Sequence, residues 1–195
     1  MNRNTLLKEL REYGIKNTVP NISDVNAKFL SDLINVKKAK NILEIGTANG
    51  FSAIHLGIAA EKNSGKVTSI ELSIPSFAEA EINIKNAKLE NTVKLIFGNA
   101  LDEIPKLEEK FDFVFIDGMM RATKNFLGLV WNKVEIGGVI IIDDVIKFKN
   151  KMPGFKEFLK EYNISHNILP IDIDDGVMMI IKQDFKIDYV VEKMD

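Results

Sequence analysis

Short runs of apolar residues alternate along most of this chain with longer stretches whose apolar positions recur at helical spacing. The runs predict β-strands, and the stretches between them predict amphipathic helices. Two runs, Phe113–Ile116 and Val139–Ile142, are apolar at every position, which is typical of strands covered on both faces. The predicted strands are residues 41–45, 66–71, 92–97, 112–116 and 138–143, and the helices between them are residues 52–61, 75–88, 101–108 and 122–133.

This alternation predicts an α/β fold with a Rossmann-like, doubly wound sheet that is mostly parallel. A helix over residues 154–162 then leads to strands over residues 165–171 and 177–182. The turn Asp172–Gly176 is too short for a crossover helix, so these last strands are expected to pair as an antiparallel hairpin at the end of the sheet.

Two helices are expected before the sheet. The first covers residues 5–13 and is stopped by Gly14, and the second covers residues 24–36, with an apolar stripe that starts at Val25. We therefore predict a single domain over residues 1–195. It consists of N-terminal helices (1–38), a core (39–182) and a loosely ordered tail (183–195).

Composition and net charge exclude several kinds of partner and catalytic site. The chain has 195 residues and a net charge of −2, so no overall basic field favours DNA as a partner. It has no cysteine, which excludes disulfides, thiolate catalysis and cysteine-bound zinc. We find neither a signal-peptide pattern nor an apolar run of membrane-spanning length, so we expect a cytoplasmic protein with no membrane partner.

The first predicted strand ends in an acid and runs into a glycine turn. Glu44 is followed by Gly46 and Gly50, and a helix comes next, whose N-terminus exposes unpaired backbone N–H groups. Glu71 closes the next strand, where a nucleotide-binding βαβ unit carries its ribose-binding acid. The loop lacks GxGxxG and the chain lacks a P-loop lysine, so S-adenosylmethionine is favoured over a dinucleotide or a triphosphate.

Acidic side chains also follow two later strands. Asp117 comes after one, and Asp143 and Asp144 come after the other. Ligands of open α/β sheets bind at the carboxyl ends of the strands, so these acids are expected to lie near the cofactor. Grouped carboxylates repel one another unless a cation bridges them, and oxygen ligands suit Mg²⁺, with Ca²⁺ or Mn²⁺ also possible. The alternative is that each acid simply caps the segment after it.

The chain resembles the cation-dependent O-methyltransferases, a family that includes catechol and caffeoyl-CoA O-methyltransferases and small bacterial enzymes that methylate 5-hydroxyuridine in tRNA. The resemblance runs from Val19 to Lys182. It implies the class I methyltransferase fold. The most specific pieces are LEIGTANGFSA, IFGNA, FIDG, GGVIIIDDV and DDGVMMIIK.

The resemblance also implies roles for individual residues. Asp117, Asp143 and Asp144 would bind the divalent cation, and Glu71 would bind the ribose hydroxyls of the cofactor. Asp144 stands where the family usually has asparagine, and Asn99 where it more often has aspartate. The implied cofactor-binding residues are Val19, Glu44, Gly46, Thr47, Ser52, Glu71, Asn99, Ala100 and Asp117.

One position departs from the family. Met120 stands where the family carries a lysine that acts as a general base, and a thioether cannot take up a proton. Lys124, one helical turn further on, is the candidate replacement, so Lys124 is predicted as catalytic together with Asp117 and Asp143. Met120 also motivates an alternative: a non-catalytic protein that binds an adenosine ligand and retains the fold.

The acceptor stays open at this point. A small phenolic or catechol-like molecule and a hydroxylated tRNA nucleoside both fit the resemblance. Lysines that follow the Asp pair could bind an anionic acceptor, or they could form the solvated side of an amphipathic helix. The lysines are Lys147, Lys149, Lys151, Lys156 and Lys160. The resemblance further implies a homodimer.

Overall fold

The computed structural model describes residues 2–171 and 176–191. The predicted turn at 172–175 and the last residues of the predicted tail, 192–195, lie outside this part. The strands are β1 (Asn41–Ile45), β2 (Lys66–Glu71), β3 (Val93–Phe97), β4 (Phe111–Ile116), β5 (Val134–Ile142), β6 (Asn167–Leu169) and β7 (Val177–Ile181). The α-helices are α1 (Arg3–Asn17), α2 (Asp24–Lys37), α3 (Phe51–Lys62), α4 (Ile74–Asn86), α5 (Ala100–Glu103), α6 (Thr123–Trp131) and α7 (Phe155–Glu161), and the short 3₁₀ turns are η1 (Ile104–Lys106), η2 (Met120–Ala122) and η3 (Lys149–Lys151).

The strands form one sheet in the order β3-β2-β1-β4-β5-β7-β6. The strands from β3 to β5 are parallel, whereas β7 pairs antiparallel with both β5 and β6. The order reverses between β1 and β4, so the carboxyl ends of these two strands meet at the switch point where open α/β sheets bind ligands. The predicted sheet and its antiparallel end are confirmed.

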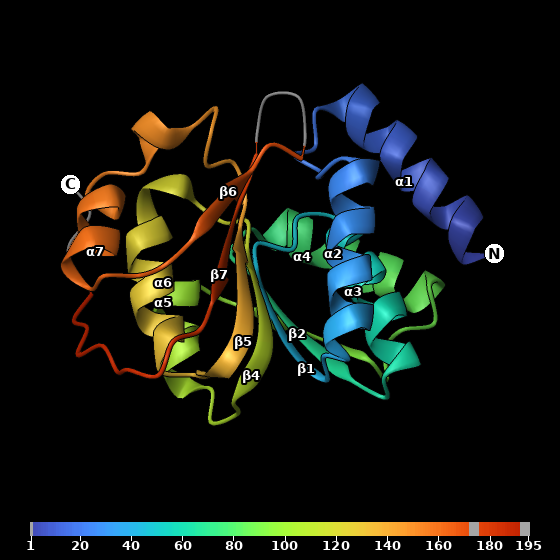
Figure 1. The fold of residues 1–195 in the computed structure, drawn as a ribbon. Helices are drawn as coiled ribbons and strands as arrows, with labels where there is room; N and C mark the ends of the chain where they lie inside the picture. Colours follow the sequence, from blue (N-terminus) through green and yellow to red (C-terminus); the bar gives the residue numbers. More distant parts are fainter. Residues whose placement is uncertain (1, 172–175, 192–195) are drawn as a thin grey trace.

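Helices cover both faces of the sheet (Figure 1), with α1 to α3 on one side and α5 to α7 on the other. Alternate residues of the central strands serve the two sides. Leu43 and Val114 pack in the core under α6 and α7, whereas Ile42 and Phe113 pack in the core under α2 and α3. All four side chains are at most 1% exposed, which accounts for the continuously apolar runs in these strands.

The N-terminal helices differ from the prediction in two respects. Helix α1 passes through Gly14 and ends at Asn17, and its C-cap residue Thr18 has a left-handed φ of 58°. A Cβ at Gly14 would lie 2.5 Å from the amide nitrogen of Asn21, so this glycine makes room for the segment after the helix rather than stopping it. On α2, Val25 is 58% exposed and the buried stripe begins with Asn26 and Ala27 instead.

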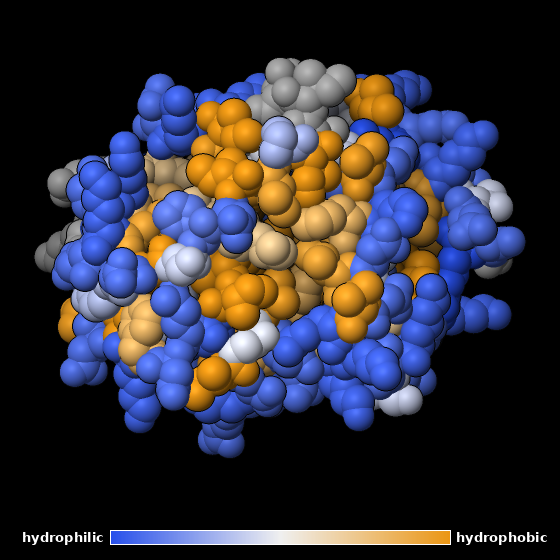
Figure 2. Space-filling model, in the orientation of Figure 1, coloured by the Kyte–Doolittle hydropathy of each residue, from blue (hydrophilic) through white to orange (hydrophobic). Residues whose placement is uncertain are grey.

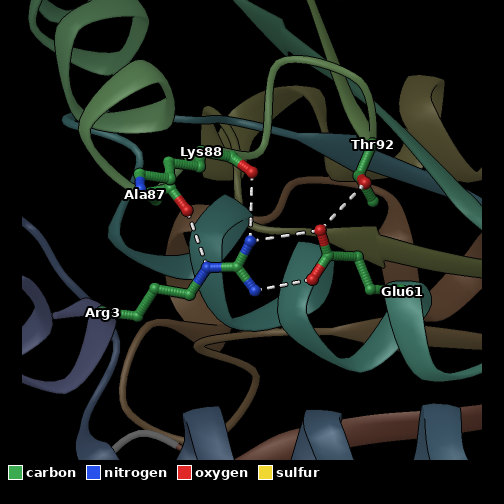
Figure 3. Close-up of polar contacts among 5 residues, drawn as sticks. All are labelled: Arg3, Glu61, Ala87, Lys88 and Thr92. Atoms are coloured by element: carbon green, nitrogen blue, oxygen red, sulfur yellow. Dashed lines mark hydrogen bonds and ion pairs between the residues drawn. The ribbon is translucent and has the colours of Figure 1, made fainter.

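Arg3 links the start of α1 to α3 and to the residues that follow α4 through hydrogen bonds (Figure 3). Its guanidinium forms two hydrogen bonds to Glu61 of α3, at 2.6 and 3.1 Å. It also donates to the carbonyl oxygens of Ala87 and Lys88, which follow α4. Thr92 donates to the same glutamate at 3.4 Å. The planar, bidentate geometry therefore joins three segments of the chain at one point.

Part of the segment predicted to be a loosely ordered tail, Phe185 to Ile187, contacts the end of α6. The indole N–H of Trp131 donates to the carbonyl oxygen of Phe185 at 3.0 Å. The Asn132 side chain donates to the carbonyl oxygen of Ile187 and accepts from its backbone N–H. These contacts satisfy the indole N–H of the buried Trp131 and the amide of Asn132 at the end of α6, so the tail has partners that its own composition did not reveal.

The surface over the β6–β7 end of the sheet is apolar at its centre and hydrophilic around it (Figure 2). Ile168 on β6 is 50% exposed and Ile181 on β7 is 47% exposed. The homodimer stays a prediction. Among the described residues, no helix combines the length and the apolar character needed to cross a membrane.

Candidate functional site

The glycine loop between β1 and α3 fits tightly against the end of β4. Gly46 has a φ of 94° and Gly50 a φ of 88°, values that glycine adopts without strain. A Cβ at Gly46 would lie closer than 3.0 Å to the carbonyl oxygen of Asp117. The Asp117 N–H donates to the carbonyl oxygen of Ile45 at 2.9 Å. The loop is therefore fixed against the first of the predicted metal-binding acids.

Glu71, at the end of β2, closes the other side of the loop. One oxygen of its carboxylate accepts from the backbone N–H groups of Thr47 and Ala48, at 3.1 and 2.8 Å. The other oxygen accepts from the N–H of Ser73 at 2.7 Å. A carboxylate held in this way at the switch point is well placed to accept from the hydroxyl groups of a ribose.

Glu44 lies beneath the loop and is fully buried. Burial raises its pKa to about 7, against the opposing effect of hydrogen bonds from Ser52 and Ser69. The Ser69 hydroxyl donates to one carboxylate oxygen at 2.5 Å, and that hydroxyl is in turn bonded to Thr47. The second carboxylate oxygen is buried and has no hydrogen-bond partner. A carboxyl group of this kind is uncharged in much of the population near neutral pH.

A pocket of about 660 Å³ opens above these groups, which is within the size range of cofactor sites. Residues from every predicted part of the site border it, including the segment Val19–Ile22 that precedes α2. The predicted site residues that line it are Val19, Gly46, Ser52, Glu71, Asn99, Ala100, Asp117 and Asp144. Asn99 also caps α5, because its side chain accepts from the N–H of Leu101.

The remaining predicted residues lie elsewhere. Glu44 and Thr47 support the loop from below, at 0 and 1% exposure, without lining the pocket. Asp143 is 8% exposed and is not part of the pocket lining. The ammonium group of Lys124 lies 3.0 Å from where a Cβ at Gly154 would be, next to the start of α7 and not in the pocket lining. The role of Lys124 as a base stays a prediction.

The acids at the acceptor end fit a hard divalent cation by their donor chemistry. Asp117 and Asp144 both border the pocket. Mg²⁺ uses one or two carboxylates, with waters and substrate oxygens completing its shell. Within residues 2–171 and 176–191, no group of three or more His, Cys, Asp or Glu side chains is placed to hold a metal.

Apart from Met120, whose departure from the family is visible in the sequence, several pocket residues were not identified from the sequence. Met119, Met120 and Phe126 give the pocket an apolar wall beside Asp117, and Ser73 and Ser76 border the side near Glu71. Ser73 could have been found, because it is a typical N-cap residue two positions after Glu71. The apolar wall has no local signature, because its side chains resemble those of any core helix.

Two of the lysines after the Asp pair, Lys156 and Lys160, lie on α7 and form the solvated side of an amphipathic helix. Phe155 and Phe158 of α7 are buried, at 6 and 3% exposure, while the lysines beside them are exposed. The ammonium groups of Lys147 and Lys151 lie over the ring of Phe148, at 5.2 and 4.6 Å from its centre. This segment therefore presents positive charge to solvent.

Comparison with known proteins identifies the family of this chain. The family model for O-methyltransferases matches residues 1–161. Catechol O-methyltransferase of Mycobacterium tuberculosis is 35% identical over 128 residues, which cover 65% of this chain and 57% of that protein. Tapetum-specific methyltransferase 1 of Arabidopsis thaliana is 28% identical over 177 residues, covering 81% of this chain and 75% of that protein.

Solved structures agree. The O-methyltransferase from Bacillus cereus in complex with SAH superposes with a TM-score of 0.79 at 27% identity, over 91% of both chains. These similarities do not favour the alternative of a non-catalytic binding protein. The chain belongs to the O-methyltransferase family, and within it to the S-adenosylmethionine-dependent enzymes of the catechol and caffeoyl-CoA type.

Proposed function

We propose that this enzyme methylates a hydroxyl group of a small, catechol-like acceptor, with a divalent cation at the strand ends that carry Asp117, Asp143 and Asp144. The observation that carries the proposal is that one pocket joins both halves of such a reaction. The glycine loop and Glu71 border it on one side, and Asp117 and Asp144 border it on the other. The names of the relatives, catechol and caffeoyl-CoA O-methyltransferases, support an acceptor of this class.

The residues of the cofactor half bind and orient. Glu71 accepts from the ribose hydroxyls, and the N–H groups at the start of α3 add a favourable electrostatic environment. Asn99 lies where it can hydrogen-bond an adenine edge. When bound, S-adenosylmethionine supplies an electrophilic methyl group and the cation acidifies the acceptor hydroxyl.

The residues of the acceptor half hold the hydroxyl and exclude water. Asp117 and Asp144 provide the anionic oxygens that a cation requires. Met119, Met120 and Phe126 form an apolar wall that suits an aromatic ring. Methyl transfer depends mainly on an in-line approach of oxygen to carbon, so positioning by these walls is the main contribution of the protein.

The experiment measures transfer of labelled methyl from S-adenosylmethionine to a panel of catechols and hydroxycinnamoyl esters, with Mg²⁺ and with a chelator. We expect turnover that stops on chelation and on Asp117→Asn. Asp112→Asn is the matched control, since Asp112 lies at the opposite end of the same strand, where it accepts from the N–H groups of Lys40 and Asn41. Full activity in the chelator would remove the cation from the proposal.

A hydroxylated tRNA nucleoside is the second candidate acceptor. The exposed lysines around Phe148 favour it, because they could contact phosphate groups beside the pocket. Labelling of unmodified and hydroxylated tRNA under the same conditions separates the two candidates. Transfer to tRNA that declines steeply with salt, without transfer to any small phenol, would replace the catechol-like acceptor by tRNA.

A further inference from the structure

Asn26 lies in the first turn of α2, far in sequence from the acids of the site. It is 3% exposed, and its backbone N–H is bound by Ser23, the N-cap of the helix. Its side-chain amide donates to one carboxylate oxygen of Asp143 at 2.9 Å, in a buried contact across 117 positions of the sequence. Hydrogen bonds between a buried amide and a charged group contribute more than those between neutral groups.

Asp143 is also hydrogen-bonded to the residue that follows it. Its second carboxylate oxygen accepts from the backbone N–H of Asp144 at 2.9 Å. Asp144 has a φ of 64°, a left-handed conformation that costs a non-glycine residue about 1–2 kcal/mol. Asp144 lines the pocket in that conformation. The Asp143 carboxylate therefore stabilises the turn that presents Asp144 to the ligand.

Burying the amide of Asn26 has a free-energy cost. Its carbonyl oxygen is buried without a hydrogen-bond partner, and such an orphaned acceptor costs about 1–3 kcal/mol. A leucine of the same shape would avoid this cost in an otherwise apolar stripe beside Ala27 and Leu30. The feature that leucine lacks is the donor aimed at Asp143.

We propose that Asn26 is a positioning residue for the acceptor end of the site: through Asp143 it fixes the backbone of Asp144 and aims the Asp144 carboxylate into the pocket. The consequence for metal binding rests on the proposed function. Helix α2 begins just after Val19–Ile22, which borders the pocket, so Asn26 connects that part of the chain with Asp143. Polar partners of this kind typically change metal affinity by about 10- to 100-fold when removed.

The test compares Asn26→Leu with Asn63→Leu. Asn63 is the matched control because its side-chain amide also donates hydrogen bonds at α2, but at the opposite end of the helix: to the carbonyl oxygen of Ile34 in the last turn and to that of Ala39 just after the helix. Three quantities are measured on the full chain: hydrogen exchange of the Asp144 amide by NMR, Mn²⁺ affinity by electron paramagnetic resonance, and affinity for S-adenosylhomocysteine by calorimetry.

We expect Asn26→Leu to speed exchange of the Asp144 amide at least about tenfold and to weaken Mn²⁺ binding about 10- to 100-fold. Affinity for S-adenosylhomocysteine stays within about twofold, and Asn63→Leu changes only the melting temperature. Asn26→Ser, which keeps a shorter donor, gives an intermediate result and replaces the leucine variant if that one does not fold.

Unchanged exchange of the Asp144 amide in Asn26→Leu overturns the proposal, whatever the metal result. If the native protein itself binds no Mn²⁺, the cation half of the proposed function fails. The exchange experiment, which needs no metal, then still decides whether Asn26 positions Asp144.

Discussion

The two halves of the pocket are built in different ways. In the cofactor half, the backbone N–H groups of Thr47, Ala48 and Ser73 all converge on one carboxylate, that of Glu71. These residues come from two adjacent parallel strands and the loops that follow them. In the acceptor half, Asn26, Asp117 and Asp144 come from three distant parts of the chain and meet only through the fold.

This difference separates what a local motif can specify from what tertiary packing must specify. The cofactor half needs left-handed glycines and an acid at a set spacing, which local backbone geometry supplies. The acceptor half requires helix α2, which precedes the sheet in the sequence, to pack correctly against the end of β5. We therefore expect cofactor binding to tolerate changes in the acceptor half, whereas acceptor chemistry depends on both halves.

The largest effect is expected from Gly46→Ala in the cofactor half. The new Cβ would clash with the Asp117 carbonyl oxygen, so the loop and the end of β4 must separate. We expect affinity for S-adenosylhomocysteine, measured by calorimetry, to fall on the order of a thousandfold, or about 4 kcal/mol.

Gly137→Ala is the control for this change. Gly137 has a similar φ of 75°, but a Cβ there would meet nothing within 4 Å. It should cost about 1 kcal/mol of stability through backbone strain alone and leave cofactor affinity unchanged. Equal losses of affinity in the two variants would show that strain, not the close approach to Asp117, accounts for the effect.

Glu44 gives the cofactor half a pH dependence. Its pKa in the folded protein is about 7, above its ordinary value of 4.5, so the folded state holds the proton more tightly than the unfolded state does. Its contribution to stability is therefore complete below about pH 4.5 and is lost as the pH rises through 7, by ~3 kcal/mol at most.

Glu44→Gln keeps the shape and removes the titration. The difference in free energy of unfolding between the variant and the native protein, from urea denaturation at pH 5 to 8, should shift steadily in favour of the variant as the pH increases. A difference that is constant across this range would mean that Glu44 stays charged in the fold.

Met120→Lys tests the acceptor half. The family position that normally carries a lysine base lies in the pocket wall here. General bases contribute about 10²–10⁴-fold, but in the proposed function a cation already acidifies the hydroxyl, so we expect about a tenfold increase in kcat at slightly acidic pH and a flatter pH profile. Met119→Lys, one residue away in the same wall, is the control and should not increase the rate. A slower Met120→Lys enzyme would indicate that the apolar wall matters more than a base.

Most of the fold could be predicted because its signals are local. Apolar runs located every strand of the parallel part, and β1 and β2 have the predicted bounds. The misses came from tertiary context. Gly14 lies within a helix because Asn21 packs against it, and the contacts of the tail depend on partners at the end of α6.

The candidate site divides along the same line. Gly46, Glu71 and Asn99 could be identified from motifs, because each lies at the end of a predicted strand or within two residues after it. Asn26 could not, since a lone asparagine in an amphipathic helix resembles any other polar residue until the fold brings it to Asp143. The pocket wall of Met119 and Phe126 was invisible for the same reason.

The smallest expected effect comes from Ala48→Gly, which asks how far the cofactor half is preorganised. Ala48 is held at a φ of 47° while its N–H donates to Glu71. Glycine removes the backbone strain of the folded state, but it also increases the conformational entropy of the unfolded chain. These effects oppose each other, so the free energy of unfolding should change by less than about 1 kcal/mol. Affinity for S-adenosylhomocysteine should fall two- to threefold, roughly, because the loop must be ordered on binding.

Lys38→Gly, at a helix end with a φ of 56°, relieves similar strain away from the pocket and should leave affinity unchanged. An unchanged affinity in Ala48→Gly would mean that the Glu71 contacts alone order the loop, and that its left-handed alanine contributes nothing to cofactor binding.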